Sequence, residues 1–423
     1  MHGTILVATA GQGILRSNDD GSTWHRLGLK EAIEFDGVVR ALAVHPHAPQ
    51  RIYAGADAGL CVSENGGASW TRVDSPMNGQ TIWSLAINPN DPRKMFAGTG
   101  APSRCRLYRS ADAGASWEAV APVFPEFCAG VNRPRLLTIA IDPQDGNDVW
   151  FGVEEGGLWR SRDGGTVWER LDAPTKAIPI SDIHAVSILR AADGAKTILV
   201  LTVNAVYRSG DDGASWSETE ARKHFDNMYY ARTVQPLADA TGDLLLAIGD
   251  GTPGTRTMLY RSADRGASWQ PTELATPPNS TFWSVGVHPD DPSLLFAGTK
   301  YGHLFRSRDG GRSWTRRGCN LPLGNYTSIL INPNNTEEIF ISSALETDGG
   351  IHYSNDAGQN WRRVDSKDMR LPSRRVWSMI FDPSNPSRIF AATHSSGIYR
   401  IDRDPATAVT ENGSRPRVSK NGN

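Results

Sequence analysis

The chain has few cysteines and no long apolar segment. Only four of its 423 residues are cysteine, none in a C-x-x-C spacing, so a zinc site and other metal or cofactor chemistry are not expected. No stretch reaches the roughly 18 apolar residues of a membrane-spanning helix. The N-terminus, Met-His-Gly-Thr, lacks the features of a signal peptide, which predicts a cytoplasmic protein without membrane contact. Cys105 and Cys128 could form a disulfide, with free thiols as the alternative.

A charge excess of either sign is also missing. The chain carries 44 basic and 46 acidic residues, a formal net charge of −2, so no global field attracts nucleic acid. The 42 glycines and 26 prolines are typical of many tight turns rather than long helices.

What the chain does contain is one short motif repeated eight times. The motif reads Ser-x-Asp-x-Gly-x-Ser/Thr-Trp, and successive copies start 45 to 53 residues apart. Three copies are imperfect, with Asn65 for the Asp and Val167 or Asn360 for the Ser/Thr. A period of this length indicates the blades of a repeat architecture rather than one globular core. The copies start at Ser17, Ser63, Ser110, Ser161, Ser209, Ser262, Ser307 and Ser354.

The residues between the motifs predict four short strands per repeat. In one repeat, 282–288, 294–298 and 303–307 are apolar runs separated by turn residues, and a fourth strand opens at Trp314. Seven complete units of this kind predict an all-β fold, a closed propeller of four-stranded antiparallel blades over residues 1–402. Residues 4–27 and 376–401 each supply three strands, so the ring closes with eight blades or, alternatively, nine. The polar tail, 403–423, is expected to be disordered, and the protein to be a monomer.

The motif itself is predicted to be structural. Its Asp or Asn can accept hydrogen bonds from its own turn, its glycine permits a positive φ, and its Trp can fill the space between blades. Eight equivalent copies around a ring cannot converge on one substrate, so a catalytic role is not expected. These structural positions are Asp19, Asn65, Asp112, Asp163, Asp211, Asp264, Asp309 and Asp356.

This pattern resembles the Asp-box, or BNR, repeat of sialidases, sortilin-type receptors, family 74 xyloglucanases and photosystem-assembly propellers. Segments such as Ile87-Asn-Pro-Asn-Asp-Pro and Met95-Phe-Ala-Gly-Thr99 are similar to the sortilin-like and xyloglucanase-like branch. The resemblance implies that the boxes lie on the face opposite the functional one. That face would carry the loops between repeats and the turns between second and third strands. Because these families include enzymes, receptors and assembly factors, the resemblance specifies the fold more than the function.

Candidate binding residues lie where each first strand begins. Counting six residues back from the proline that ends this strand gives a position that often holds an aromatic or basic residue. Such residues could form a ligand platform around the central opening, or they could pack as wedges between blades. Nearby arginines could bind anions or be simply solvated. The predicted ligand-binding residues are Trp83, Tyr230, Trp283, Trp377, Arg40, His184, Arg135, Arg232 and Arg375, with Arg133 and Arg374 in the same loops.

These residues favour a non-catalytic binding or scaffold propeller whose ligand is a glycan or a protein segment. The alternative is a xyloglucanase-like or sialidase-like glycoside hydrolase with two paired carboxylates on the same face. Its candidates are Asp36, Glu154, Glu155 and Asp250, but the Arg-Ile-Pro motif that the sialidase resemblance would require is absent. A third hypothesis, from the photosystem-assembly resemblance, is a chaperone for a partner complex.

Overall fold

A computed structural model of the chain shows an all-β protein. No helix occurs among the residues that the structure describes. These residues are 5–8, 14–17, 25–26, 39–48, 50–65, 69–120, 122–128, 133–171, 178, 182–190, 194–202, 205–219, 231–237, 244–248, 259–272, 274, 282–288, 290–299, 303–318, 320–322, 324–345, 349–364, 376–382, 385–393 and 397–402.

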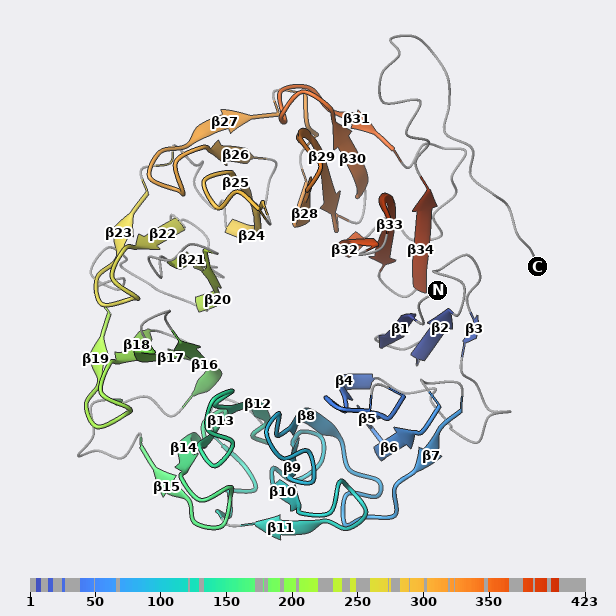
Figure 1. The fold of residues 1–423 in the computed structure, drawn as a ribbon, viewed down its shortest axis with the longest axis vertical. Coiled ribbons are helices and arrows are strands. Elements are labelled where there is room, and N and C mark those ends of the chain that lie inside the picture. The colour runs from blue at the N-terminus through green and yellow to red at the C-terminus, as the bar shows by residue number, and fades with distance from the viewer. Residues whose placement is uncertain are drawn as a thin grey trace. The chain divides into compact units, whose positions relative to one another are not determined.

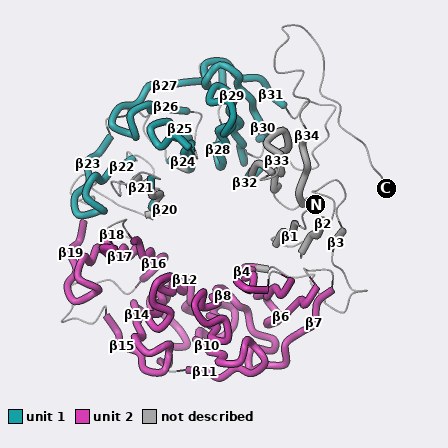
Figure 2. The backbone as a smooth tube through the Cα atoms, viewed as in Figure 1, with its two compact units in different colours: residues 1–2, 19–23, 220–423 teal, residues 3–18, 24–219 magenta. Residues whose placement is uncertain are grey.

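Contacts between residues group the chain into two compact units (Figure 2). Unit 1 comprises residues 1–2, 19–23 and 220–423, and unit 2 comprises residues 3–18 and 24–219. The predicted single propeller domain over 1–402 stays a prediction.

Unit 2 contains four four-stranded sheets and one three-stranded sheet, each formed by strands consecutive in the chain (Figure 1). The three-stranded sheet consists of β1 (Ile5–Ala8), β2 (Ile14–Ser17) and β3 (His25–Arg26). The four-stranded sheets are β4 (Val39–Val44), β5 (Ile52–Ala56), β6 (Gly59–Ser63) and β7 (Thr71–Arg72); β8 (Ile82–Ile87), β9 (Met95–Thr99), β10 (Leu107–Ser110) and β11 (Glu118–Val120); β12 (Leu136–Ile141), β13 (Val149–Val153), β14 (Gly157–Ser161) and β15 (Glu169–Arg170); and β16 (Ile183–Arg190), β17 (Lys196–Thr202), β18 (Val206–Ser209) and β19 (Ser217–Glu218).

Unit 1 repeats this plan in three four-stranded sheets and one three-stranded sheet. The four-stranded sheets are β20 (Ala231–Pro236), β21 (Leu244–Ile248), β22 (Leu259–Ser262) and β23 (Gln270–Pro271); β24 (Phe282–Val287), β25 (Leu295–Thr299), β26 (Leu304–Ser307) and β27 (Thr315–Arg317); and β28 (Tyr326–Asn332), β29 (Asn335–Ser343), β30 (Gly350–Ser354) and β31 (Arg362–Arg363). The three-stranded sheet is β32 (Val376–Asp382), β33 (Asn385–Thr393) and β34 (Gly397–Asp402).

The sheets confirm the predicted all-β repeat of four-stranded antiparallel blades. Every strand pair among the described residues is antiparallel, and the seven predicted units are seven four-stranded sheets. The strands β1–β3 and β32–β34 form separate three-stranded sheets among the described residues. The number of blades in the ring and its mode of closure stay predictions, and the tail, 403–423, lies outside the described residues.

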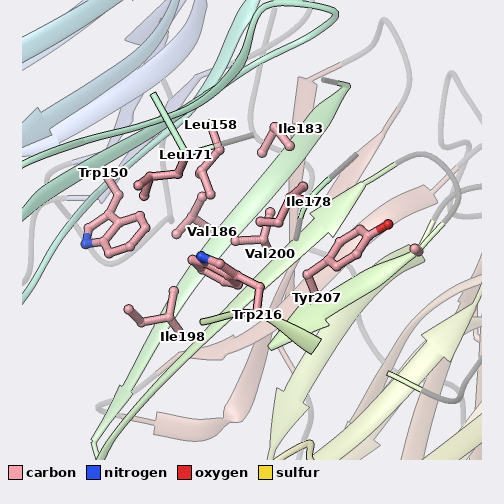
Figure 3. Close-up of a cluster of buried hydrophobic side chains, with 11 residues drawn as sticks. Trp150, Leu158, Leu171, Ile178, Ile183, Val186, Ile198, Val200, Tyr207 and Trp216 are labelled. Carbon is pink, nitrogen blue, oxygen red and sulfur yellow. The ribbon is translucent and has the colours of Figure 1, made fainter. Parts of the chain in front are cut away.

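The core lies between neighbouring sheets of a unit. All five residues of a typical second strand, such as β9 or β13, are buried, because this strand has a sheet on each side. Figure 3 shows one apolar cluster, which contains Trp150 of β13 and Leu158 of β14 together with Ile198 and Val200 of the following sheet. Burial of such side chains stabilises the fold by about 1.5–3 kcal/mol each.

A glycine in the second strand lets neighbouring sheets approach closely. A Cβ on Gly98 would lie 2.4 Å from Ser84 Oγ and 2.5 Å from Leu136 Cδ2 of the next sheet. Ser84 Oγ donates a hydrogen bond of 2.8 Å to the carbonyl of Leu136 at this contact. The Phe-Ala-Gly segment of the repeat therefore ends in glycine because a side chain there would separate two sheets.

Each described motif closes its turn through the Asp or Asn side chain. In the copy at Ser110, the Asp112 carboxylate accepts bonds from Ser110 Oγ (2.8 Å) and from the backbone N–H (2.8 Å) and hydroxyl (2.5 Å) of Ser116. The hydroxyl of Ser116 is the main reason that the pKa of Asp112 is lowered to about 2. The Trp117 indole N–H donates to the Gly114 carbonyl at 3.0 Å.

The imperfect copies all keep the backbone N–H bond of the turn. Asn360 Nδ2 donates to the Asp356 carboxylate at 2.8 Å in place of a hydroxyl. Asn65 Oδ1 accepts from the Ser69 N–H at 2.8 Å, as an aspartate would. Val167 offers only its backbone N–H to Asp163, at 3.0 Å. The turn thus depends on backbone donors that most residues can supply.

Neighbouring sheets are also joined by a hydrogen bond that ends on the motif. In several copies, the arginine directly before the motif's serine donates to the carbonyl of the fourth residue in the motif of the next sheet. Arg261 Nε donates to the Gly310 carbonyl at 2.8 Å, and Arg306 Nη1 to the Ala357 carbonyl at 3.2 Å. Val62 replaces the arginine in β6, and Tyr53 OH donates to the Ala113 carbonyl at 2.7 Å instead. The motif therefore also accepts hydrogen bonds from the neighbouring sheet, a role that its sequence does not reveal.

Candidate functional site

The first strand of every complete sheet contains a β-bulge, and so does β32. In β8, Ile82 pairs with Thr99 and Ser84 with Gly98, so Trp83 is the extra, unpaired residue. A bulge redirects the side chain of its extra residue and often occurs beside binding sites. The bulged residues are Arg40, Trp83, Leu137, His184, Arg232, Trp283, Thr327 and Trp377.

Seven of the eight bulged residues occupy the positions predicted from the sequence. Six were predicted by counting back from the proline, and His184 was predicted from its equivalent place in the repeat. The eighth differs, because the bulge of β20 falls between Ala231 and Thr233 and therefore holds Arg232 rather than Tyr230. The count misplaces this position because Pro236 is the last residue of β20, whereas in other repeats the proline follows the strand. Tyr230 itself lies outside the described residues.

Three predicted residues of unit 2 meet around one indole ring. The guanidinium carbons of Arg40 and Arg135 lie 4.6 Å and 5.0 Å from the centroid of the Trp83 ring. Each arginine also pairs with a carboxylate from a turn between second and third strands. Arg135 Nη2 donates to Glu154 Oε1 at 2.9 Å, and Arg40 Nη1 pairs with Asp57. We call these five residues the Trp83 cluster.

The backbone brings the members of the Trp83 cluster together. Gly100, which follows β9, forms an isolated antiparallel bridge with Arg135, and a Cβ on Gly100 would lie 2.5 Å from Arg135 Cα. The Trp83 indole N–H donates to the Ala101 carbonyl at 2.9 Å in the same loop. The orientation of the Trp83 ring is therefore fixed at its edge as well as at its faces.

A second aromatic group lies in the segment between β11 and β12. Arg133 Nη1 donates to the Pro102 carbonyl at 2.9 Å, and its guanidinium lies 5.4 Å from the Phe127 ring centroid. Phe127 is 60% exposed, whereas Phe124 of the same loop is buried against Phe151. The buried Phe124 holds this loop in place and leaves an accessible ring near the Trp83 cluster.

The electrostatics of the Trp83 cluster are balanced. Its two guanidiniums are matched by the carboxylates of Asp57 and Glu154, so it has no net charge to attract an anion over distance. Its side chains are half-buried, and that of Glu154 is 10% exposed. The guanidinium groups of Arg40 and Arg135 already lie over the Trp83 ring. A ligand would therefore contact these planar polar groups rather than a bare aromatic face.

Asp57 was missed in the sequence, although a signal was present. It directly follows β5, just as Glu154 directly follows β13, so the two carboxylates occupy equivalent positions of their repeats. A comparison of repeats at the end of the second strand would have found it.

The remaining predicted residues are distributed as follows. His184 Nε2 lies 3.3 Å from Asp182 Oδ1 at the bulge of β16, with both side chains about one-quarter exposed. Glu155 lies in the turn after β13, and burial, followed by the Glu155 carboxylate, raises the pKa of Cys128. Arg232, Trp283 and Trp377 lie on described strands, but their side chains are outside the description. Five other predicted residues lie outside the described residues entirely: Asp19, Asp36, Asp250, Arg374 and Arg375.

Cys105 and Cys128 are free thiols in the structure, and so is Cys61. Burial raises the pKa of Cys105 well above its usual value and that of Cys61 to about 11. Within the described part of the chain, no group of three or more His, Cys, Asp or Glu side chains is placed to hold a metal ion. That part also has no helix with the length and hydropathy to cross a membrane.

At the motif end of unit 2, charged side chains surround a cavity of about 310 Å³ between sheets β12–β15 and β16–β19. Lys196 Nζ lies 2.9 Å from carboxylate oxygens of both Asp142 and Asp212 and also pairs with Asp148. Arg160 Nε donates to Asp148 at 2.6 Å, and Arg160 Nη2 to Asp212 at 2.7 Å. We call this set the ionic seam; it is lined by Asp142, Asp145, Asp148, Arg160, Arg162, Arg190, Lys196 and Asp212.

Four carboxylates and four cations face one another in the ionic seam, so its charges compensate internally. The side chains of Asp142, Asp148 and Arg160 are 0–3% exposed. Hydrogen bonds from Arg190 and Lys196 outweigh burial, which acts in the opposite sense, and lower the pKa of Asp142 to about 2. Such a self-satisfied network joins two sheets and leaves no charge unmatched for a ligand.

Comparison with known proteins places the chain among β-propellers. One family model, described as "Sortilin, neurotensin receptor 3", matches residues 12–121, and a second, "DUF6242 beta propeller domain", matches residues 106–294. A xyloglucanase of Hypocrea jecorina is 27% identical over 66% of this chain and 38% of its own length. Sortilin of Danio rerio is 24% identical over 79% of this chain and 39% of its own length.

Solved structures include an ancestral GH74 enzyme, 14% identical with a TM-score of 0.44, over 95% of this chain and 74% of that chain. The structure "YCF48 bound to D1 peptide" is 17% identical with a TM-score of 0.42, over 77% of this chain and 94% of that chain. The chain spans between about three-tenths and four-tenths of the length of the curated relatives it matches first.

The repeated four-stranded antiparallel sheets and their Asp-box turns define the chain as a β-propeller protein. The family models and the curated relatives agree on its branch. The chain is similar to sortilin-like and xyloglucanase-like propellers.

Proposed function

We propose that the chain is a non-catalytic binding propeller that recognises a glycan segment at the strand ends of unit 2 that carry the Trp83 cluster. The Trp83 cluster is the observation that carries this proposal. It combines an indole, two guanidiniums and two carboxylates in one half-buried, charge-balanced group.

The chemistry of the cluster suits a neutral, hydroxyl-rich ligand. A hydroxyl both donates and accepts, so it can bond to carboxylate oxygens and to guanidinium N–H groups at the same time. An anion would gain little, because each guanidinium already has a carboxylate partner. The exposed ring of Phe127 offers apolar surface for a longer ligand beyond Arg133. The curated relatives named xyloglucanase support a glycan as the ligand class.

Binding can be tested with a panel of oligosaccharides that includes xyloglucan fragments, and with a peptide library, by isothermal titration calorimetry. We expect saturable binding of a glycan by the intact chain, weakened at least about tenfold in Trp83→Ala, the factor that corresponds to losing one good contact. Leu137→Ala is the matched control, because Leu137 is the bulged residue of the adjacent sheet and lies outside the cluster. Circular dichroism verifies that both variants fold.

The proposal fails if no oligosaccharide binds, or if Trp83→Ala and Leu137→Ala bind alike. Binding of peptides alone, sensitive to Trp83, would instead assign the site to a protein segment, the other ligand class expected from the sequence. The monomeric state and the cytoplasmic location stay predictions that size-exclusion chromatography and fractionation can test.

A glycoside hydrolase is the second candidate, because the Trp83 cluster contains two carboxylates, Glu154 and Asp57, and several relatives carry that activity in their names. In this structure both Glu154 oxygens are engaged by Arg135, which leaves less of the carboxylate for a substrate. Release of reducing ends from xyloglucan, abolished in Glu154→Gln, would establish the enzyme. We expect no release from the intact chain.

A further inference from the structure

The arginine before the motif's serine has acidic partners in unit 2. Arg109 of β10 pairs with Glu118 of β11 at 2.6 Å. Arg160 of β14 pairs with Asp148 and Asp212, at 2.6 Å and 2.7 Å. In unit 1, Arg306 of β26 occupies the same place and likewise donates to the next motif, at the Ala357 carbonyl.

All three acidic partners are missing around Arg306. Thr315 pairs across from Arg306 in β27, where Glu118 pairs across from Arg109. Leu294, which directly precedes β25, replaces Asp148, which directly precedes β13. Ala357 replaces Asp212, because each is the fourth residue of its motif. Three neutral residues thus replace three carboxylates, and the positive charge stays.

Two further guanidiniums stand beside Arg306. The register pairs Leu304 with Arg317 and Arg306 with Thr315, so Arg306 and Arg317 are diagonal neighbours on one face, about 7–8 Å apart. Arg308, the second residue of the motif, is exposed. Arg317 also borders the next motif, since its Cβ is 3.7 Å from where a Cβ on Gly358 would lie.

These charges have no counterion within the described residues. No ion pair to Arg306, Arg308 or Arg317 is found there, and the Nε atoms of Arg306 and Arg317 are buried without a hydrogen-bond partner in the same region. Burial, followed by the positive charges of Arg317 and Arg308, lowers the pKa of Arg306. A partly buried cation without a counterion is costly, and a bound anion removes that cost.

We propose that Arg306, Arg308 and Arg317 form a binding site for a tetrahedral oxyanion, a phosphate or sulfate group, at the motif end of sheet β24–β27. Three guanidinium forks can contact three oxygens of such a group, whereas a carboxylate offers two. The group can come from the free ion or from a sulfated polysaccharide. The site lies at the opposite strand ends from the bulged residues, and its existence does not depend on the proposed glycan site.

The chain's own repeats supply the test variants. Thr315→Glu places the carboxylate of Glu118 opposite Arg306, and Arg317→Leu copies Leu171 at the equivalent position of sheet β12–β15. Both should fold, since Thr315 is exposed and Arg317 only half-buried. Arg93→Leu is the control, because it removes an exposed arginine of unit 2 that pairs with Asp91.

Calorimetric titration of the full chain with sodium phosphate and sodium sulfate, at constant ionic strength in chloride, measures binding of the free ions. We expect saturable binding by the unmodified chain and by Arg93→Leu, and about tenfold or greater weakening in Thr315→Glu and Arg317→Leu, the loss expected for one charge-assisted contact. A sulfated polysaccharide binding with the same dependence on variants, and more tightly than free sulfate, would identify that source.

The proposal is overturned if neither phosphate, sulfate nor the sulfated polysaccharide binds saturably. It is also overturned if the unmodified chain and all variants bind these anions equally tightly. Acetate binding as tightly as phosphate would overturn the tetrahedral assignment.

Discussion

Replacing Lys196 in the ionic seam should destabilise the protein strongly, because the lysine neutralises carboxylates that have almost no access to water. Lys196→Met keeps most of the side-chain volume and removes the charge. Asp142 and Asp148, 0% and 3% exposed, would lose a cation within hydrogen-bond distance and retain only Arg190 and Arg160. Removing one partner of a buried ion pair costs about 3–5 kcal/mol. We expect Lys196→Met to lower the free energy of unfolding by about 3 kcal/mol, the lower end of this range, because each carboxylate keeps one arginine.

The same reasoning predicts that a second substitution restores stability. Asp148→Leu alone leaves Lys196 and Arg160 short of a carboxylate and should cost a similar amount. Combined with Lys196→Met, it removes one charge of each sign, and Leu294 shows that leucine fits the equivalent place in another repeat. Because apolar replacement of a whole buried pair is often neutral, the double variant should unfold within about 1–2 kcal/mol of the unmodified chain.

Urea unfolding followed by tryptophan fluorescence, together with circular dichroism, measures these free energies. Arg93→Met serves as the control, because Arg93 is 74% exposed in its pair with Asp91 and should change stability by less than about 1 kcal/mol. The reasoning is refuted if Lys196→Met unfolds like the control, or if the two single effects simply add in the double variant.

The seam also predicts how stability depends on pH. The pKa of Asp142 is lowered to about 2 in the folded chain, below the ordinary value of 3.8, and that of Asp212 is lowered as well. A lowered folded-state pKa contributes stability that is present above about pH 4 and is lost as the pH falls toward 2. Lys196→Met should weaken this acid dependence, which urea titrations at pH 5 and pH 3 can compare.

Three further results are expected. Gly98→Ala should destabilise the chain by about 1–3 kcal/mol through overlap with Ser84, measured by urea unfolding, and an unchanged midpoint would contradict the close approach of the two sheets. Ser116→Ala should cost about 1 kcal/mol in the same assay by removing one hydroxyl bond of the motif, and a loss above 3 kcal/mol would contradict that local role. Mass-spectrometric mapping with a thiol reagent should label Cys128 before Cys105, since Cys105 is 5% exposed and its pKa is raised, and the reverse order would refute that burial.

The sequence by itself determined the repeat, because its signals are local. A serine, an aspartate, a glycine and a tryptophan within eight residues form one turn whose bonds stay inside the turn, as in the Ser110–Trp117 copy. The alternation of short apolar runs and turn residues likewise predicted the strands of seven sheets. Even the bulged residues, such as Arg40 and Trp83, follow from their fixed distance to the end of a strand.

Only the tertiary structure decided which charges meet. Arg40, Trp83 and Arg135 come from three different sheets, and Arg160 reaches Asp212 across 52 positions of chain. The physical reason is that strands and turns form from residues close together in the chain. Whether a charge is compensated depends instead on which side chain of the neighbouring sheet lies beside it. That difference makes Arg160 part of a closed network of charges and leaves Arg306 Nε buried without a hydrogen-bond partner among the described residues.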